Sequence, residues 1–172
     1  MSGSGGVGQF FLMLFPLLMI LGGAGDVMTR RIPNSLVVGT AALFLPAALA
    51  TGMPLWIMSL HVATAAVLLA LGFGLFSFGV VGGGDAKMMA AAGLWLGFPC
   101  SILFITFSAL AGGLLAAAMG LWFLVTMEGG MHSAWFDKAV APLKPSVPYG
   151  FALAAGAILA TPFSWWMRAA IG

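Results

Sequence analysis

The stretch LWIMSLHVATAAVLLALGFGLFSFGV, from Leu55 to Val80, contains no Asp, Glu, Lys or Arg. A helix needs about 20 consecutive apolar residues to cross the hydrocarbon core of a bilayer, and this stretch is long enough. The rest of the chain is similar: of its 172 residues, 62% are hydrophobic and 6% are charged, and the mean hydropathy is +1.14. Because soluble domains carry about 25% charged residues, the composition predicts a protein that has the bilayer as its solvent.

Further apolar runs on both sides of this stretch predict six membrane segments, and hence an all-α, polytopic membrane helix bundle that forms a single domain over residues 1–172. The expected segments are Phe10–Asp26, Leu36–Ala50, Leu55–Val80, Ala86–Phe98, Ile102–Thr126 and Phe151–Met167. The fourth is short for a full crossing. Residues 1–9 are rich in Gly and Ser and are expected to form a flexible tail. They contain no basic residue, so the first run is interpreted as a retained span and not as a cleaved signal peptide.

The basic residues predict the orientation of the bundle. If the six segments alternate in direction, five of the six basic residues fall in loops on one side: Arg30, Arg31, Lys87, Lys138 and Lys144. Only Arg168 falls on the other. Cytoplasmic loops carry an excess of Lys and Arg, so these loops are expected in the cytoplasm and the amino terminus outside. The net charge of +2 comes from scattered residues that form no patch, which argues against a nucleic-acid partner.

Two of the four acidic residues stand at membrane borders. Asp26 closes the first segment, and Asp85 lies between the third and the fourth. An ionised carboxylate there costs a few kcal/mol unless it is paired or hydrated, so such residues usually mark function. The alternating topology places both at the same cytoplasmic border, as a working pair requires. The other two, Glu128 and Asp137, are expected to be solvated charges of the loop after the fifth segment.

Two carboxyl groups that share a site hold a single proton, because they cannot both ionise at low cost. The ionised group can then take a proton from an attacking water, while the protonated group hydrogen-bonds the carbonyl oxygen of a peptide. This chemistry needs no metal or cofactor. The chain contains one cysteine, Cys100, and no CxxC pair, and it offers no convincing metal-ligand set.

The residues around each aspartate have alternative interpretations. Gly82, Gly83 and Gly84 directly precede Asp85. These glycines let the backbone take unusual conformations and let a substrate approach closely. Alternatively, they form a hinge between two helices. The alternative interpretation of Asp26 is a simple surface pair with Arg30, one turn later. The basic residues Arg30, Arg31 and Lys87 are expected to act mainly as positive-inside anchors.

Small residues recur every four positions in two of the segments, and we expect them to form helix-packing faces. These residues are Ala66, Ala70 and Gly74 in the third segment, and Gly112, Ala116 and Gly120 in the fifth. His61 lies in the third segment, away from the aspartate border, and is expected to make a helix-packing hydrogen bond. Trp165 and Trp166 are expected to be interfacial anchors.

Three stretches resemble the type IV prepilin peptidases, which are aspartyl proteases of the GxGD type. They are DVMTRRIPN at Asp26–Asn34, GGGDAK at Gly82–Lys87 and VPYGFAL at Val147–Leu153. The likeness covers essentially the whole chain, in order and with suitable spacing. The resemblance implies that Asp26 and Asp85 are the catalytic pair. It also implies a supporting role for the remaining residues of the first two stretches: Gly82, Gly83, Gly84, Lys87, Arg30, Arg31, Pro33 and Asn34.

The resemblance further implies a multi-pass protein of the bacterial inner membrane that cleaves short basic leaders from prepilin-like proteins on the cytoplasmic side. The substrate would be cut just before its hydrophobic helix. Larger members of the family add a cysteine-bearing zinc region and methylate the new amino terminus. This chain lacks such an insertion, so it resembles the small, peptidase-only members found with Flp-type (tight adherence) pili, and methyltransferase activity is not expected.

Two other classes of function remain open on the sequence. A small proton- or cation-coupled transporter subunit also uses intramembrane carboxylates and glycine-broken helices. Against it, no polar residues track across the membrane between the aspartates and the other border, and no internal repeat is convincing. A structural subunit of a secretion machine that retains a peptidase fold is the third possibility, although both aspartates are kept.

Overall fold

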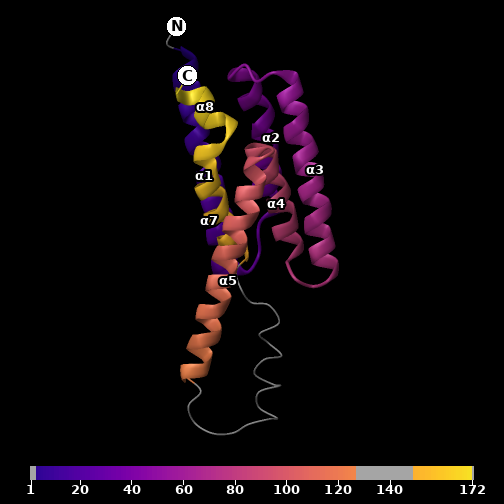
Figure 1. Ribbon diagram of the computed structural model, residues 1–172, viewed down its shortest axis with the longest axis vertical. Helices are drawn as coiled ribbons and strands as arrows, with labels where there is room; N and C mark the ends of the chain where they lie inside the picture. The colour runs from indigo at the N-terminus through magenta and orange to yellow at the C-terminus, as the bar shows by residue number, and fades with distance from the viewer. Residues whose placement is uncertain (1–2, 127–148, 172) are drawn as a thin grey trace.

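The protein is described by a computed structural model over residues 3–126 and 149–171 (Figure 1). These residues form helices and connecting turns, with no strand among them. The elements are α1 (Gly3–Thr29), α2 (Asn34–Ala50), α3 (Leu55–Ser77), α4 (Gly83–Leu96), α5 (Cys100–Thr126), α7 (Tyr149–Ala160), the 3-10 turn η2 (Thr161–Phe163) and α8 (Trp165–Ile171). Every predicted segment has a helical counterpart, which confirms the all-α membrane bundle. The loop residues Glu128, His132, Asp137, Lys138 and Lys144 lie outside the described residues.

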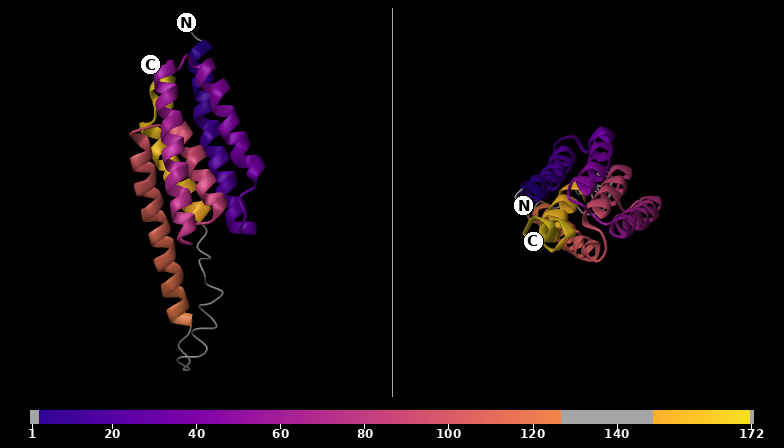
Figure 2. Two further views of the ribbon diagram at one scale, coloured as in Figure 1. Left: turned by 90° about the vertical axis from the view of Figure 1, so that its right-hand side faces the viewer. Right: turned by 90° about the horizontal axis from the view of Figure 1, so that it is seen from above.

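Among the described residues, three helices are long and apolar enough to cross a membrane: Gln9–Thr29 in α1, all of α3, and Cys100–Trp122 in α5. Shorter apolar helices occupy Asn34–Ala50 and Tyr149–Phe163. Large apolar side chains such as Val67 and Leu114 point outward and are exposed. In water such a surface would be costly, whereas lipid solvates it. α5 runs past the end of the bundle at which α1 finishes (Figure 2).

The helix α1 includes most of the residues that the sequence predicts to form a flexible tail. The helix begins at Gly3, so most of residues 1–9 continue the first span. Once a helix is nucleated, each added residue gains one backbone hydrogen bond for the conformational freedom that it loses, so a helix extends readily beyond its apolar core. Flexibility of this first stretch stays a prediction.

α3 and α4 form an antiparallel pair at close approach. A Cβ on Gly72 would lie 2.8 Å from Ala86 Cα, and one on Gly93 would lie 2.6 Å from Leu68 Cδ1. His61 is buried in the same contact and its Nδ1 lies 2.8 Å from the Leu94 carbonyl oxygen. The predicted packing bond of His61 is therefore confirmed.

The small-residue face predicted for α3 is wrong. Ala66 and Ala70 point outward, whereas the buried face of α3 holds His61, Thr64, Leu68 and Gly72. Both faces contain small residues at helical spacing, and the one that packs is set by the large Leu68 side chain fitting over Gly93. On α5, Gly112 is buried and a Cβ there would meet Ala152 of α7 at 3.5 Å, while Ala116 and Gly120 remain exposed.

An aromatic cluster fills the core at the far end of α4. Trp95 stacks on Phe15 of α1 at a centroid distance of 5.3 Å and lies 5.0 Å from the ring of Trp166 in α8. Its Nε1–H donates to the Thr40 carbonyl at 2.7 Å, and Nε1–H of Trp166 donates to the Trp95 carbonyl at 2.5 Å. Indole donors are thus satisfied by main-chain oxygens inside the bundle.

The sixth segment is not one continuous helix, and Trp166 is not an interfacial anchor. α7 ends at Ala160, η2 contains Pro162, and Ser164 is extended before α8 begins. Proline has no N–H to continue the helical ladder, and the resulting break turns Trp166 into the core, where it is 2% exposed. α8 packs beside α1, so the two helices at the ends of the described chain lie together (Figure 1).

Candidate active site

Asp26 and Asp85 lie at the same end of the bundle. α1 finishes at this end, the turn from α3 to α4 lies here, and α7 begins here (Figure 1). Each aspartate is 8% exposed. The structure therefore brings together two buried carboxyl groups that are far apart in the sequence, as alternating segments predicted.

Asp26 is held by the first turn of α7. The Gly150 backbone N–H donates to Asp26 Oδ2 at 2.9 Å. The first N–H groups of a helix have no partner within the helix, and the helix dipole favours a negative charge beside them. The approach is close: a Cβ on Gly150 would lie 2.7 Å from Asp26 Cβ and 3.0 Å from Oδ2. A residue larger than glycine at 150 would displace the carboxylate.

Gly150 is a site residue that the sequence analysis did not single out. It falls within the VPYGFAL stretch, but nothing in that stretch showed that its main chain reaches Asp26. One turn earlier on α1, Gly23 also packs against α7, where an added Cβ would lie 2.9 Å from Ala154 Cβ. The two glycines together bring α1 and α7 close enough for the Asp26 bond to form.

Asp85 is fixed within its own helix. It lies in the first turn of α4, before the expected fourth membrane segment, and its Oδ2 accepts the Gly82 N–H at 2.9 Å. Burial is the main cause that raises the pKa of Asp85 to about 6. The Gly82 bond opposes this rise, and the negative charge of Asp26 adds to it. The two carboxyl groups therefore interact electrostatically, and Asp85 retains its proton to a higher pH than an ordinary aspartate does.

The connection from α1 to α2 links the surroundings of the two aspartates. Arg30 adopts a left-handed conformation (φ 55°), and its N–H donates to the Asp26 carbonyl at 2.9 Å. A non-glycine residue in this region of backbone space is uncommon. The turn directs the chain across the end of the bundle, and Ile32 then contacts the position of Gly84, next to Asp85. Ile32 is the second residue that the sequence analysis did not select.

The remaining residues of the RRIPN stretch complete the connection. The Thr29 hydroxyl donates to the carbonyl of Arg31 at 3.1 Å. Pro33 is the N-cap residue of α2, and Asn34 begins that helix. Lys87 Nζ donates to Asn34 Oδ1 at 3.1 Å, which joins the start of α2 to the first turn of α4. Lys87 thus has a contact in the structure beyond its expected role as an anchor.

The glycines before Asp85 serve close packing, and none of the three adopts a left-handed backbone. A Cβ on Gly84 would lie 3.3 Å from Ile32 Cβ, and one on Gly82 would lie 3.0 Å from Asp85 Oδ2. Gly83 faces the ring of Phe76 at ordinary contact distance. The left-handed glycine of this turn is Gly79, at φ 71°. The predicted need for unusual conformations therefore applies to Gly79, and close approach explains Gly82 and Gly84.

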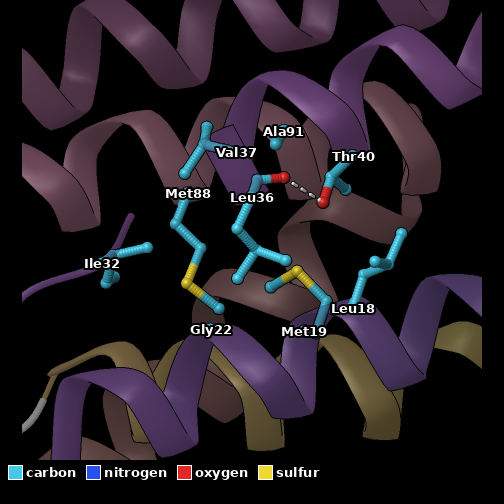
Figure 3. A pocket seen from close by; sticks show the side chains of 9 residues that line it. All are labelled: Leu18, Met19, Gly22, Ile32, Leu36, Val37, Thr40, Met88 and Ala91. Carbon is cyan, nitrogen blue, oxygen red and sulfur yellow. Dashed lines mark hydrogen bonds between the residues drawn. The ribbon is translucent and has the colours of Figure 1, made fainter. Parts of the chain in front are cut away.

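A void between α1, α2 and α4 lies near the Ile32 connection (Figure 3). Its volume is about 10 Å³, at the lower limit for a single water. Met88 points across it toward Gly22, and the Thr40 hydroxyl beside it is bonded to the Leu36 carbonyl at 2.8 Å. The walls of the void are apolar, and the Thr40 hydroxyl beside it already has a hydrogen-bond partner. The void is therefore a small gap in the helix packing and not a binding site.

The two carboxyl groups are the reactive groups that this end of the bundle presents. Asp26 accepts the Gly150 N–H at the N-terminus of α7, and the pKa of Asp85 is raised. Two such carboxyl groups can share one proton, and a pair that shares one proton can activate water and polarise a carbonyl. Within residues 3–126 and 149–171, no three His, Cys, Asp or Glu side chains cluster in a way that could hold a metal ion.

Comparison with known proteins gives two matches. Residues 13–117 match the sequence model of the type IV leader peptidase family, and this range contains both aspartates. The chain is also similar to a prepilin leader peptidase/N-methyltransferase of Bacillus subtilis (strain 168), with 28% identity over 168 residues. The alignment covers 95% of this chain and 61% of the relative, so the chain spans about three-fifths of the relative's length. No solved structure matches.

Proposed function

Because this chain belongs to the type IV leader peptidase family, we propose that it is a membrane-embedded aspartyl endopeptidase that removes the short basic leader from type IV prepilin-like proteins of the Flp type. The observation that supports this proposal most directly is the burial of Asp26 and Asp85 at one end of the bundle, where the charge of one acts on the other. The catalytic roles of both residues are part of the proposal.

The two aspartates take different roles in the proposed mechanism. Asp26, beside the N-terminus of α7, is the ionised member and takes a proton from water as the water oxygen attacks the scissile carbonyl carbon. Asp85 keeps its proton and donates a hydrogen bond to the carbonyl oxygen. The tetrahedral intermediate then breaks its C–N bond, and the leaving nitrogen takes up the proton that Asp26 accepted from water. The products are a leader with a new carboxylate and a mature chain with a new amino group.

We place the aspartate end of the bundle at the cytoplasmic face of a bacterial inner membrane. Arg30, Arg31 and Lys87 all lie at this end, and cytoplasmic borders are enriched in basic residues. The same basic residues lie near the proposed catalytic site. The other supporting residues shape that site and hold it in place: Gly82, Gly83, Gly84, Pro33 and Asn34.

We propose peptidase activity without N-methyltransferase activity. The relative from B. subtilis is named for both activities, whereas this sequence contains a single cysteine and no CxxC pair for a zinc region. The single cysteine, Cys100, is 4% exposed, and its Sγ lies 2.8 Å from the Phe163 carbonyl oxygen. It packs at the start of α5, just after the end of α4 that is opposite to Asp85. Mass spectrometry of the cleaved product tests this point: the expected mature chain has an unmodified amino terminus.

The decisive experiment reconstitutes the protein in liposomes with a prepilin that carries a basic leader. Asp26→Asn and Asp85→Asn should each reduce cleavage by at least about 10²-fold, the usual scale for loss of a general acid or base. Ser59→Ala, on the exposed surface of α3, is the matched control and should cleave normally. Thermal unfolding verifies that each variant is folded. Cleavage that survives both aspartate substitutions contradicts the mechanism, and aspartate-dependent proton or cation flux with an intact prepilin would favour a transporter.

A further inference from the structure

Two closely packed helix pairs carry the two aspartates. In the first pair, α1 packs on α7, and a Cβ on Gly23 would lie 2.9 Å from Ala154 Cβ. In the second pair, α3 packs on α4, and a Cβ on Gly72 would lie 2.8 Å from Ala86 Cα. Interiors packed this closely transmit displacement and do not absorb it. Each pair therefore moves as one unit at the aspartate end.

Each aspartate is hydrogen-bonded within its own pair. The Gly150 N–H of α7 donates to Asp26 Oδ2 of α1 at 2.9 Å. The Gly82 N–H, at the start of α4, donates to Asp85 Oδ2 at 2.9 Å. Neither of these two bonds crosses from one pair to the other. Since proton sharing depends on the separation of the carboxyl groups, contacts between the pairs control that separation.

The connection from α1 to α2 makes such contacts on both sides of Asp85. A Cβ on Gly84 would lie 3.3 Å from Ile32 Cβ and 3.7 Å from Ile32 Cγ1. Lys87 Nζ donates to Asn34 Oδ1 at 3.1 Å. Gly84 directly precedes Asp85, and Lys87 follows it by two residues. The connection therefore contacts the first turn of α4 before and after the carboxyl group.

The same connection begins at Asp26. The Arg30 N–H donates to the Asp26 carbonyl at 2.9 Å, and Arg30 turns the chain with its left-handed backbone. The Thr29 hydroxyl lies 2.8 Å from the Gly25 carbonyl oxygen, one turn earlier on α1. This start of the connection is thus a bonded turn with a defined direction. A contact that Ile32 makes with α4 is carried back to the end of α1.

Ile32 also covers the first turn of α4 with apolar surface. Its side chain is partly buried and packs against the hydrophobic core, and it lines one side of the small void that Met88 crosses (Figure 3). Asp85 is 8% exposed, and burial is the main cause of its raised pKa. An apolar side chain beside Gly84 keeps water from the main chain next to this carboxyl group.

We propose that Ile32 is a positioning residue, which by packing on Gly84 holds the first turn of α4 against the end of α1 and so sets the separation and hydration of the two carboxyl groups. This inference rests on the proposed peptidase function. Ile32 contacts no reacting atom in this role and acts through Asp85. The bond from Lys87 to Asn34 is exposed to water and assists the same contact.

Ile32→Ala tests the proposal, with Ile57→Ala as its matched control. Both isoleucines are partly buried and pack against the same core, but Ile57 lies near the start of α3, away from the turn that leads to Asp85. Ile32→Ala removes the apolar cover and should lower the pKa of Asp85. In liposomes, kcat/KM for a prepilin should fall about tenfold or more. Its decline at high pH should begin about one pH unit lower, because Asp85 then loses its proton sooner.

The control and a conservative variant separate this role from a loss of stability. Ile57→Ala should lower the melting temperature and leave the pH profile of the wild type. Ile32→Val keeps the Cβ and one branch beside Gly84, so it should restore most of the shift. The other charged or titratable groups described at this end are left unchanged by these substitutions: Asp26 on α1, Arg30 and Arg31 on the connection, Lys87 on α4 and Tyr149 at the start of α7.

Infrared titration without substrate gives a measurement that does not depend on cleavage. The carbonyl stretching band of protonated Asp85 is identified as the band that Asp85→Asn lacks. This band should disappear at a lower pH in Ile32→Ala than in wild type or Ile57→Ala. A band and a pH profile that both stay at their wild-type positions in Ile32→Ala would overturn this inference, whatever the change in stability. Wild type that shows the titrating band but cleaves no prepilin would instead overturn the proposed function.

Discussion

At the far end of α4, indole N–H groups donate to main-chain carbonyls, whereas at the aspartate end main-chain N–H groups donate to carboxyl oxygens. Trp95 and Trp166 form the first arrangement with packed rings around them. Asp26 and Asp85 form the second beside glycines and turns. Large rigid rings bury apolar area and satisfy one donor each, so they add stability. Buried carboxyl groups cost stability and retain reactivity.

This contrast suggests that the aromatic end of the bundle provides stability and the aspartate end provides the chemistry. The aromatic end holds α1, α2, α4 and α8 together, and the aspartate end is held in place by that packing. A change at the aromatic end should therefore reduce stability more than chemistry. A change at the aspartate end should do the reverse, and in one case should even increase stability.

The largest expected effect is at the aromatic end. Trp95→Ala removes a fully buried ring that contacts Phe15 and Trp166, and it should lower the free energy of unfolding by about 3–5 kcal/mol. Thermal unfolding in detergent measures this loss. Trp95→Phe keeps a ring but loses the bond to the Thr40 carbonyl, and should cost less. Folded Trp95→Phe protein should cleave prepilin normally. A loss of kcat with an unchanged melting temperature would contradict the idea that the aromatic end contributes to stability and not to the chemistry.

The second effect is a gain in stability at the aspartate end. The folded-state pKa of Asp85 is about 6, above its ordinary value of 3.8, so the folded state binds this proton more tightly than the unfolded state does. The stability that Asp85 contributes is present at low pH and is lost as the pH rises from about 4 to about 6. One pKa unit corresponds to about 1.4 kcal/mol, so the loss is at most about 3 kcal/mol.

Asp85→Asn should therefore be inactive yet more stable than wild type above pH 6, with the difference shrinking toward pH 4. Chemical unfolding of both proteins across this range measures the difference. A stability difference that does not change with pH would contradict the assignment of a raised pKa to Asp85. The same titration predicts that wild-type kcat/KM falls as the pH rises above about 6, because Asp85 then loses the proton that it donates.

The third effect concerns geometry without a change of charge. Gly150→Ala places a Cβ 2.7 Å from Asp26 Cβ and must shift the carboxylate or α7. A displacement of about 1 Å can cost about 10²-fold in rate, so kcat/KM for prepilin should fall by that order. Gly39→Ala on α2, where an added Cβ would meet nothing within 4 Å, is the control. Full activity of Gly150→Ala would show that the site tolerates movement of Asp26.

The sequence was sufficient to predict the helices and the shared end of the two aspartates. Apolar length sets the segments, and alternation of direction then places Asp26 and Asp85 together. It did not predict which face of α3 packs, because Ala66 and Gly72 are both small and the choice depends on Leu68 meeting Gly93. Nor did it predict burial of Trp166, since tryptophan near a segment end is also typical of an interface and the break at Pro162 reorients it.

Gly150 and Ile32 were missed for a related reason. Both act on the aspartates through space, one by a main-chain N–H and the other by packing on Gly84, and neither carries a reactive side chain. A pattern of residue types identifies groups that perform chemistry. It does not identify groups that act through their shape or their backbone.

The bond from Gly150 to Asp26 has a consequence for how this protein tolerates variation. Its donor belongs to the main chain, so every non-proline residue at position 150 would supply the same N–H, and only side-chain volume decides whether the bond forms. In a saturation scan, position 150 should therefore rank substitutions by size, with serine and alanine impaired less than leucine or phenylalanine. At positions 26 and 85, the activity of each variant should instead depend on whether its side chain can carry a proton, whatever the size of that side chain.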